Sequence, residues 1–149
     1  MINKILLFTC ALVLVTGLTQ FGRAESPGLE YLDDAMRTKM NATGLQDLNQ
    51  VIDLLQKALD KGLDEEDTTF AESMMSDALM QRASSLVRVI NTQSMGDKRV
   101  QQIYRLVVSD LRRVLAFADP PADAHYMLGK LMELPGGDPH EARRHLSIY

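Results

Sequence analysis

Apolar side chains recur along this chain at steps of three and four residues, and clusters of Gly, Pro, Asn and Asp separate the apolar segments. Such steps place side chains on one face of a helix, because a helix turns about 100° per residue. The pattern therefore predicts an all-α fold of about six antiparallel helices. The expected helices span residues 27–40, 45–61, 68–91, 98–118, a fifth between the Asp119-Pro120-Pro121 corner and Leu134, and 139–149.

The inner faces predicted for these helices are aliphatic and rich in methionine, since the chain has no Trp and only four Phe and four Tyr. In the fifth helix, Gly129 is expected to allow another backbone to approach closely. The side chains expected to face inward on the first and third helices are Leu29, Leu32, Met36 and Met40, and then Phe70, Met74, Ala78, Leu79, Ala83, Leu86, Val87 and Ile90.

Helix ends carry recognisable capping residues. An Asp or Ser side chain accepts a hydrogen bond from the first turn, and Pro suits the first helical position, where no N–H is needed. Gly62 is expected to end the second helix in a left-handed conformation. The expected N-caps are Ser26, Asp97, Asp138 and either Asp119 or Asp123, with Pro27 and Pro139 at first positions and Glu141 completing a capping box.

The first 24 residues have the pattern of a secretory signal peptide. A short basic start is followed by an apolar run from Ile5 to Val15, and small residues precede a cleavage site between Ala24 and Glu25. The run is shorter than the roughly 20 residues of a spanning helix. We therefore expect an exported protein, periplasmic or secreted, with residues 1–24 removed and one helical domain at 25–149. The last helix has a strong start and no terminator before Tyr149, which predicts a truncated product or a fragment.

Charge and cysteine content exclude several classes of function. Removing residues 1–24 takes away Lys4 and Arg23, leaving 14 basic against 20 acidic side chains and a formal charge of −6. An acidic chain of this kind argues against a nucleic-acid partner and against an anionic membrane surface after cleavage, because both need a basic face. The only cysteine, Cys10, lies in the signal, so the mature domain has no disulfide, thiolate nucleophile or cysteine metal ligand.

Several polar groupings suggest chemistry, and each has a simpler structural explanation. The four acids of residues 64–67 lack the spacing of a calcium loop and suit the positive start of a helix. His140 and His145 are five residues apart and cannot share a metal on one helix face. Arg99, Arg105, Arg112 and Arg113 spread over a wide arc, which favours a solvated, salt-paired surface. We expect no catalytic residue, metal site or cofactor here.

Residues 107–149 resemble the tetratricopeptide repeat (TPR) family. The resemblance rests on the first-helix segment 124–131 with its Leu128-Gly129 pair, on second-helix positions Val107, Leu111 and Val114, and on a proline corner at Asp119-Pro120-Pro121. It is weak over residues 29–91. The resemblance implies an α-solenoid of stacked helix–turn–helix hairpins whose first helices line a concave groove. On that register the groove residues are Asp123, Tyr126, Lys130 and Glu133.

Two hypotheses about function follow. The first is a non-catalytic scaffold that binds a protein or peptide partner in the concave groove. The second is a helical N-terminal module of a longer secreted enzyme, such as one with a thioredoxin-like domain beyond Tyr149. The oligomeric state is not indicated by the sequence. Asn41-Ala42-Thr43 also fits the glycan acceptor pattern, although a polar turn is the favoured interpretation.

Overall fold

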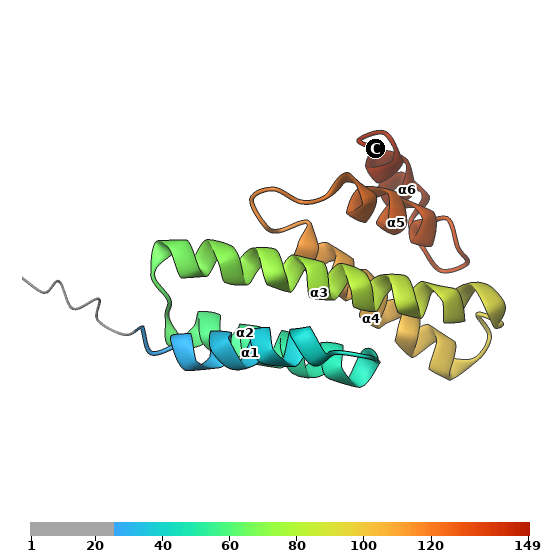
Figure 1. The fold of residues 1–149 in the computed structure, drawn as a ribbon. Coiled ribbons are helices and arrows are strands. Elements are labelled where there is room, and N and C mark those ends of the chain that lie inside the picture. The colour runs from blue at the N-terminus through green and yellow to red at the C-terminus, as the bar shows by residue number, and fades with distance from the viewer. Residues whose placement is uncertain (1–25) are drawn as a thin grey trace, which may run out of the picture.

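The computed structural model describes residues 26–149, so the predicted signal peptide and its cleavage site at Ala24 and Glu25 lie outside the described residues. Residues 26–149 form helices and no strand, which confirms the predicted all-α class. The helices are α1 (Leu29–Asn41), α2 (Leu45–Lys61), α3 (Glu65–Thr92), α4 (Lys98–Val114), α5 (Ala122–Met132) and α6 (Pro139–Leu146) (Figure 1). None of these helices is both long and apolar enough to cross a membrane.

Successive helices pack against each other as hairpins, α1 with α2, α3 with α4, and α5 with α6. The first helices of the hairpins form one layer, which Figure 1 shows as α1, α3 and α5 one above another. Two side-chain contacts join this layer. Lys39 Nζ donates to Gln81 Oε1 at 3.0 Å, and Ser84 Oγ contacts Met127 Sδ at 3.9 Å.

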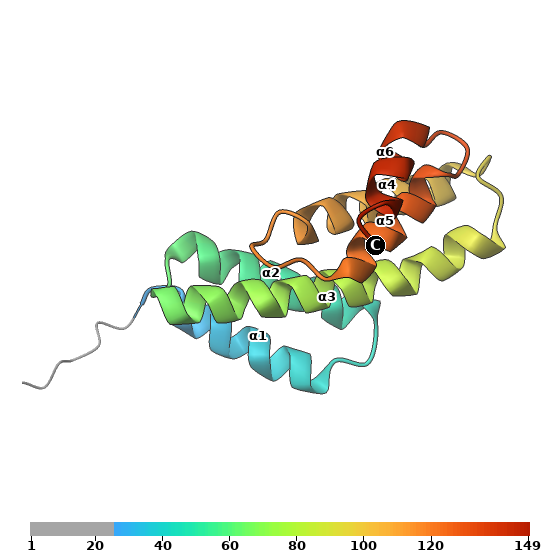
Figure 2. The same ribbon diagram turned by 90° about the horizontal axis from the view of Figure 1, so that it is seen from above.

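The second helices of the hairpins, α2, α4 and α6, form the other layer. In the view from above, α4 and α6 lie on the opposite side of α3 from α1 (Figure 2). Arg113 of α4 donates to Gln56 Oε1 of α2 at 2.7 Å. On the other side of α4, Arg112 Nη2 donates to Glu141 Oε2 of α6 at 2.9 Å. The most extensive packing between hairpins is by consecutive helices, α2 against α3 and α4 against α5, and it joins the hairpins into a stack.

The core between the layers is aliphatic, as predicted, with one methionine among its largest buried members. Burying each such side chain contributes about 1.5–3 kcal/mol. Small residues on α3 let neighbouring helices approach, because Ala71, Ala78 and Ala83 are fully buried. The largest fully buried apolar side chains are Leu32, Leu55, Met75, Leu79, Leu111, Leu128, Val51, Val100, Val107 and Val114.

Two apolar side chains predicted to face inward are exposed. Met40 is 85% exposed and Phe70 is 46% exposed. The buried face of α1 is centred on Leu32 and Ala35, and Met40 lies about 110° around the helix from it. In α3 the buried face contains Met75, and Phe70 projects from roughly the opposite side. Apolar spacing alone therefore set the wrong register at both positions.

Two helix starts also differ from the prediction. Ser26 and Pro27 do not open α1; they form a turn in which the Ser26 carbonyl accepts from the Leu29 N–H at 2.9 Å. Helix α3 starts at Glu65 rather than at Thr68, because Asp64 Oδ1 accepts from the Asp67 N–H at 2.9 Å. The remaining acids of this segment thus lie in the first turn of α3, where the helix dipole favours negative charge.

The second helix has the predicted bounds, and Gly62 ends it with φ of 94°. Helix α4 ends at Val114 and continues only as turns towards Phe117. Neither Asp119 nor Asp123 is the N-cap of α5. That position is Pro121, whose carbonyl accepts from the Ala124 N–H at 2.9 Å, while Asp123 lies in the first turn.

The start of α6 is as predicted, with Pro139 at its first position and Asp138 Oδ1 accepting from the His140 N–H at 2.8 Å. Glu141 does not complete a capping box, because its carboxylate binds Arg112 of α4 instead. The helix does not run to Tyr149. It ends at Leu146, where the Ser147 N–H returns to the Arg143 carbonyl at 3.0 Å.

One buried ion pair joins three helices. Asp110 of α4 is 2% exposed and is the only charged residue buried within residues 26–149. Arg82 of α3 reaches it with two hydrogen bonds, Nε to Oδ2 at 2.8 Å and Nη2 to Oδ1 at 2.7 Å. The remaining Nη1 donates to Asn49 Oδ1 of α2 at 2.7 Å. The bidentate pair joins α3 to α4 within the second hairpin, and the bond to Asn49 ties that hairpin to α2 of the first.

Candidate functional site

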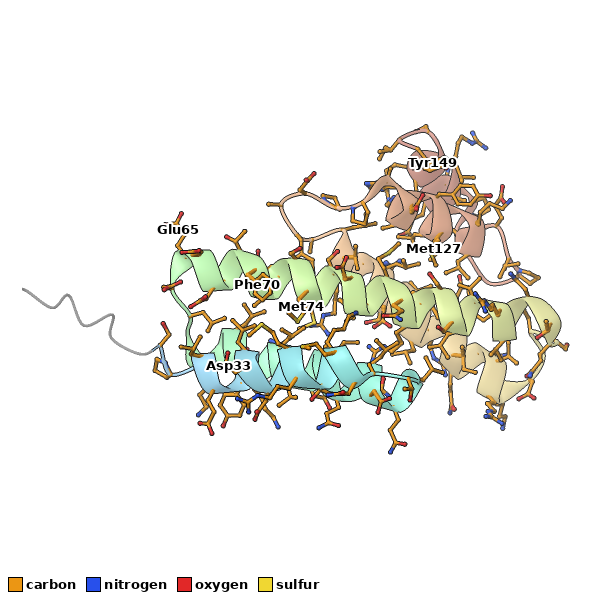
Figure 3. The ribbon with its side chains drawn as sticks, in the orientation of Figure 1. Asp33, Glu65, Phe70, Met74, Met127 and Tyr149 are labelled. Atoms are coloured by element: carbon orange, nitrogen blue, oxygen red, sulfur yellow. The ribbon has the colours of Figure 1, made fainter. Side chains whose placement is uncertain are left out.

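A groove lies between the C-terminal half of α3 and the length of α5, on the layer formed by the first helices. Its volume is about 320 Å³. Met127 lies on the side of α5 that faces α3 (Figure 3), where its Sδ contacts Ser84 Oγ at 3.9 Å. The groove is lined by Val87, Asn91, Tyr126, Met127, Lys130, Leu131, Glu133 and Leu134.

Three of the four residues predicted from the resemblance line this groove. Tyr126, Lys130 and Glu133 occur at steps of four and three, so they project from one face of α5 and its C-cap. Asp123 is exposed in the first turn of α5 and is not among the lining residues. The sequence missed the α3 side of the groove, because Val87 was expected to be a core residue.

The polar rim of the groove is a charged pair beside an aromatic side chain. Lys130 and Glu133 form an ion pair across one turn. The hydrogen bond and charge of Glu133 raise the pKa of Lys130, so the ammonium stays protonated at neutral pH. Tyr126 is 42% exposed, and its ring packs against Tyr149 with centroids 4.8 Å apart. An aromatic anchor with an adjacent ion pair can hold an apolar segment and orient it by hydrogen bonds.

A larger hollow of about 650 Å³ lies on the second-helix layer, between α4 and the start of α6. Arg105, Arg112 and Arg113 line it. Two of these guanidinium groups are already engaged, since Arg112 binds both oxygens of Glu141 and Arg113 binds Gln56. Of the four arginines predicted to form a salt-paired surface, Arg112 makes an ion pair, whereas Arg113 bonds to the neutral amide of Gln56.

A histidine pair joins α5 to α6, and the sequence reasoning did not anticipate it. His125 Nδ1 and His145 Nδ1 are 2.8 Å apart, and the rings stack with centroids 5.1 Å apart. His145 Nε2 also lies 3.7 Å from Glu141 Oε1. The signal in the sequence was that His125 lies in the segment 124–131, beside the core positions expected from the resemblance.

Within residues 26–149 no group of three or more His, Cys, Asp or Glu side chains is close enough to hold a metal ion. His140 does not join the histidine pair and is exposed near the start of α6. Comparison with protein-family models, curated proteins and solved structures finds no match. The groove geometry is therefore the main guide to function.

Proposed function

We propose that this protein is a non-catalytic interaction scaffold, built from TPR-like helical hairpins, that binds a short peptide segment of a partner protein. The observation that carries the proposal is the groove between α3 and α5. It combines an exposed aromatic ring and apolar side chains with a small number of polar groups. The order of the helices in two layers supports the TPR-like description, because the groove lies on the layer of first helices.

The chemistry of the lining residues suggests what the groove binds. Val87, Leu131 and Leu134 supply apolar surface, and Tyr126 supplies a broad aromatic face. Asn91 carries a side-chain amide that can both donate to and accept from a peptide backbone. A volume of about 320 Å³ is near the lower end of ordinary ligand pockets. We infer an extended segment with one or two apolar anchors.

Selection from a library of random short peptides tests this function. Enriched peptides should carry apolar anchors. Their affinity, measured by fluorescence anisotropy, should fall at least about tenfold when Tyr126→Ala and Lys130→Ala are combined, because central aromatic anchors dominate interface energy. The matched control is Leu106→Ala on α4, a residue that is 41% exposed and lies outside the groove.

The fold should survive the double substitution, since both side chains are exposed. Failure to enrich any peptide, or an equal loss of affinity in the Leu106→Ala control, would count against the proposed function. Loss of folding in the double variant would show that the two residues are structural and would reject the groove assignment. Export of the protein, and the alternative of a module attached to an enzyme, remain predictions from the sequence.

A further inference from the structure

We propose that His125 and His145 form a proton-sensitive joint, which holds α6 against α5 at neutral pH and loosens when both rings are protonated. The inference rests on the contact between the two Nδ1 atoms, which are 2.8 Å apart and lie between the packed helices α5 and α6. It concerns the docking of α6 and does not depend on whether the groove binds a peptide.

A direct Nδ1–Nδ1 contact needs one donor and one acceptor. One ring must carry its proton on Nδ1, and the other must present an unprotonated Nδ1. A first additional proton can be accommodated, because an imidazolium still donates to a neutral ring. A second proton places an N–H on both facing atoms. The hydrogen bond is then lost, and two positive rings face each other with centroids 5.1 Å apart.

Some groups around the pair lower the pKa of His145, and one raises it. Burial and the charge of His125 lower the pKa of His145, with smaller contributions from Arg144 and Arg112, while Glu141 opposes them. Glu141 is itself bound by Arg112, so its carboxylate is partly neutralised by that guanidinium. The net effect is a pKa of His145 below its ordinary value.

The sign of the pH dependence follows from this lowered pKa. A histidine whose pKa is lower when folded contributes its full stability above its unfolded pKa of about 6.5. That contribution declines as the pH falls through this value towards the folded pKa. The docking of α6 should therefore weaken in mildly acidic solution, well before most carboxylates are protonated.

The contacts of α6 make it the element that would move. It is eight residues long, and its other contacts to α5 include Leu146 against Gly129. Tyr149, which follows α6, packs against Tyr126. The link from α6 to α4 is the Arg112–Glu141 pair, in which the Arg112 side chain is 56% exposed. A short helix that contacts the rest of the molecule mainly through α5 can open locally while the first two hairpins stay folded.

Hydrogen exchange of the α6 amides tests the joint. The full chain is compared at about pH 7.5 and about pH 5, with rates corrected for intrinsic exchange. We expect the open population of α6 to rise at least about tenfold at the lower pH, because two like charges repel across a partly buried contact. His145→Asn should abolish most of this rise, and His125→Asn should reduce it by removing the second charge while the burial of His145 remains. His140→Asn is the matched control and should retain it, since His140 is exposed outside the pair.

An unchanged open population in the parent protein would overturn the proposal. So would an acid response of equal size in both pair variants, because it would then come from carboxylates such as Glu141. Imidazole ¹⁵N spectra of the parent protein give a test that needs no variant. One ring should be the Nδ1–H tautomer at about pH 7.5, and the two rings should titrate as a coupled pair. Two independent rings with ordinary titration would also overturn it.

Discussion

Breaking the buried Arg82–Asp110 pair is the sharpest perturbation of the fold that the contacts suggest. Asp110→Leu leaves the guanidinium of Arg82 without its carboxylate, and Arg82→Met leaves the carboxylate without its cation. Both groups are withdrawn from water, with side-chain exposures of 11% for Arg82 and 2% for Asp110. Neither group can be rehydrated without opening the contact between α3 and α4.

The expected loss of folding stability follows from the burial of both groups. Removing one partner of a buried pair costs about 3–5 kcal/mol, because an uncompensated charge remains. Small domains have about 5–15 kcal/mol of stability in total, so either single variant loses a large part of it. The melting temperature should fall by about 10–15 °C. The double variant should recover to within about 2 kcal/mol of the parent, because apolar replacements of both groups leave no buried charge.

Urea denaturation followed by circular dichroism gives the free energy of unfolding of the parent protein, the two single variants and the double variant. The coupling energy between Arg82 and Asp110 should be at least about 2 kcal/mol. Asp34→Ala is a matched control, because Asp34 pairs with Arg37 at 3.4 Å on the surface, with side chains 49% and 76% exposed. That variant should lose about 0.5 kcal/mol or less. Single variants at the buried pair that cost no more than this control would refute the reasoning.

Two further predictions concern close packing and a helix cap. Gly129→Val should destabilise the protein by about 2–3 kcal/mol, because overpacking strains a tight contact. A Cβ at Gly129 would lie 2.7 Å from Leu146 Cγ, so thermal denaturation should show partial rescue by Leu146→Ala. At the start of α2, N–H groups of Thr43 and Gly44 lower the pKa of Asp47. This cap is complete above the unfolded pKa of about 3.9 and is lost as the pH falls through the lower folded value. The amide shifts of Thr43 and Gly44 should titrate with that lowered midpoint and lose this transition in Asp47→Asn.

Local signals were sufficient for both bounds of α2 and for the starts of α4 and α6. The bounds of α2 follow from polar residues before Leu45 and from Gly62, which adopts positive φ where side chains are disfavoured. The N-caps Asp97 and Asp138 also behave as expected. These features depend only on residues near each other in the chain, so the sequence contains them directly. The start of α3 was missed because its acids fit a loop and a first helical turn equally well.

Contacts between distant segments could not be derived in the same way. Asp110 follows Val107 at a core spacing of three, which marks an acid in an apolar stripe. Its partner Arg82 is 28 residues earlier, and only the packing of α3 on α4 shows that they meet. The histidine pair likewise depends on how α6 folds back on α5. In the groove, the residues from α5 could be predicted. The residues from α3 could not, because which of its faces borders the groove depends on how α3 is oriented about its own axis.

Backbone chemical-shift mapping with an enriched peptide tests the proposed binding groove most directly. If the groove binds the peptide, perturbed amides should cluster at Val87 and Asn91 on α3 and at Tyr126 and Lys130 on α5. The first hairpin, from α1 to α2, should be unaffected. Perturbations that cluster on the α4–α6 hollow instead, or that are absent from both α3 and α5, would contradict the account.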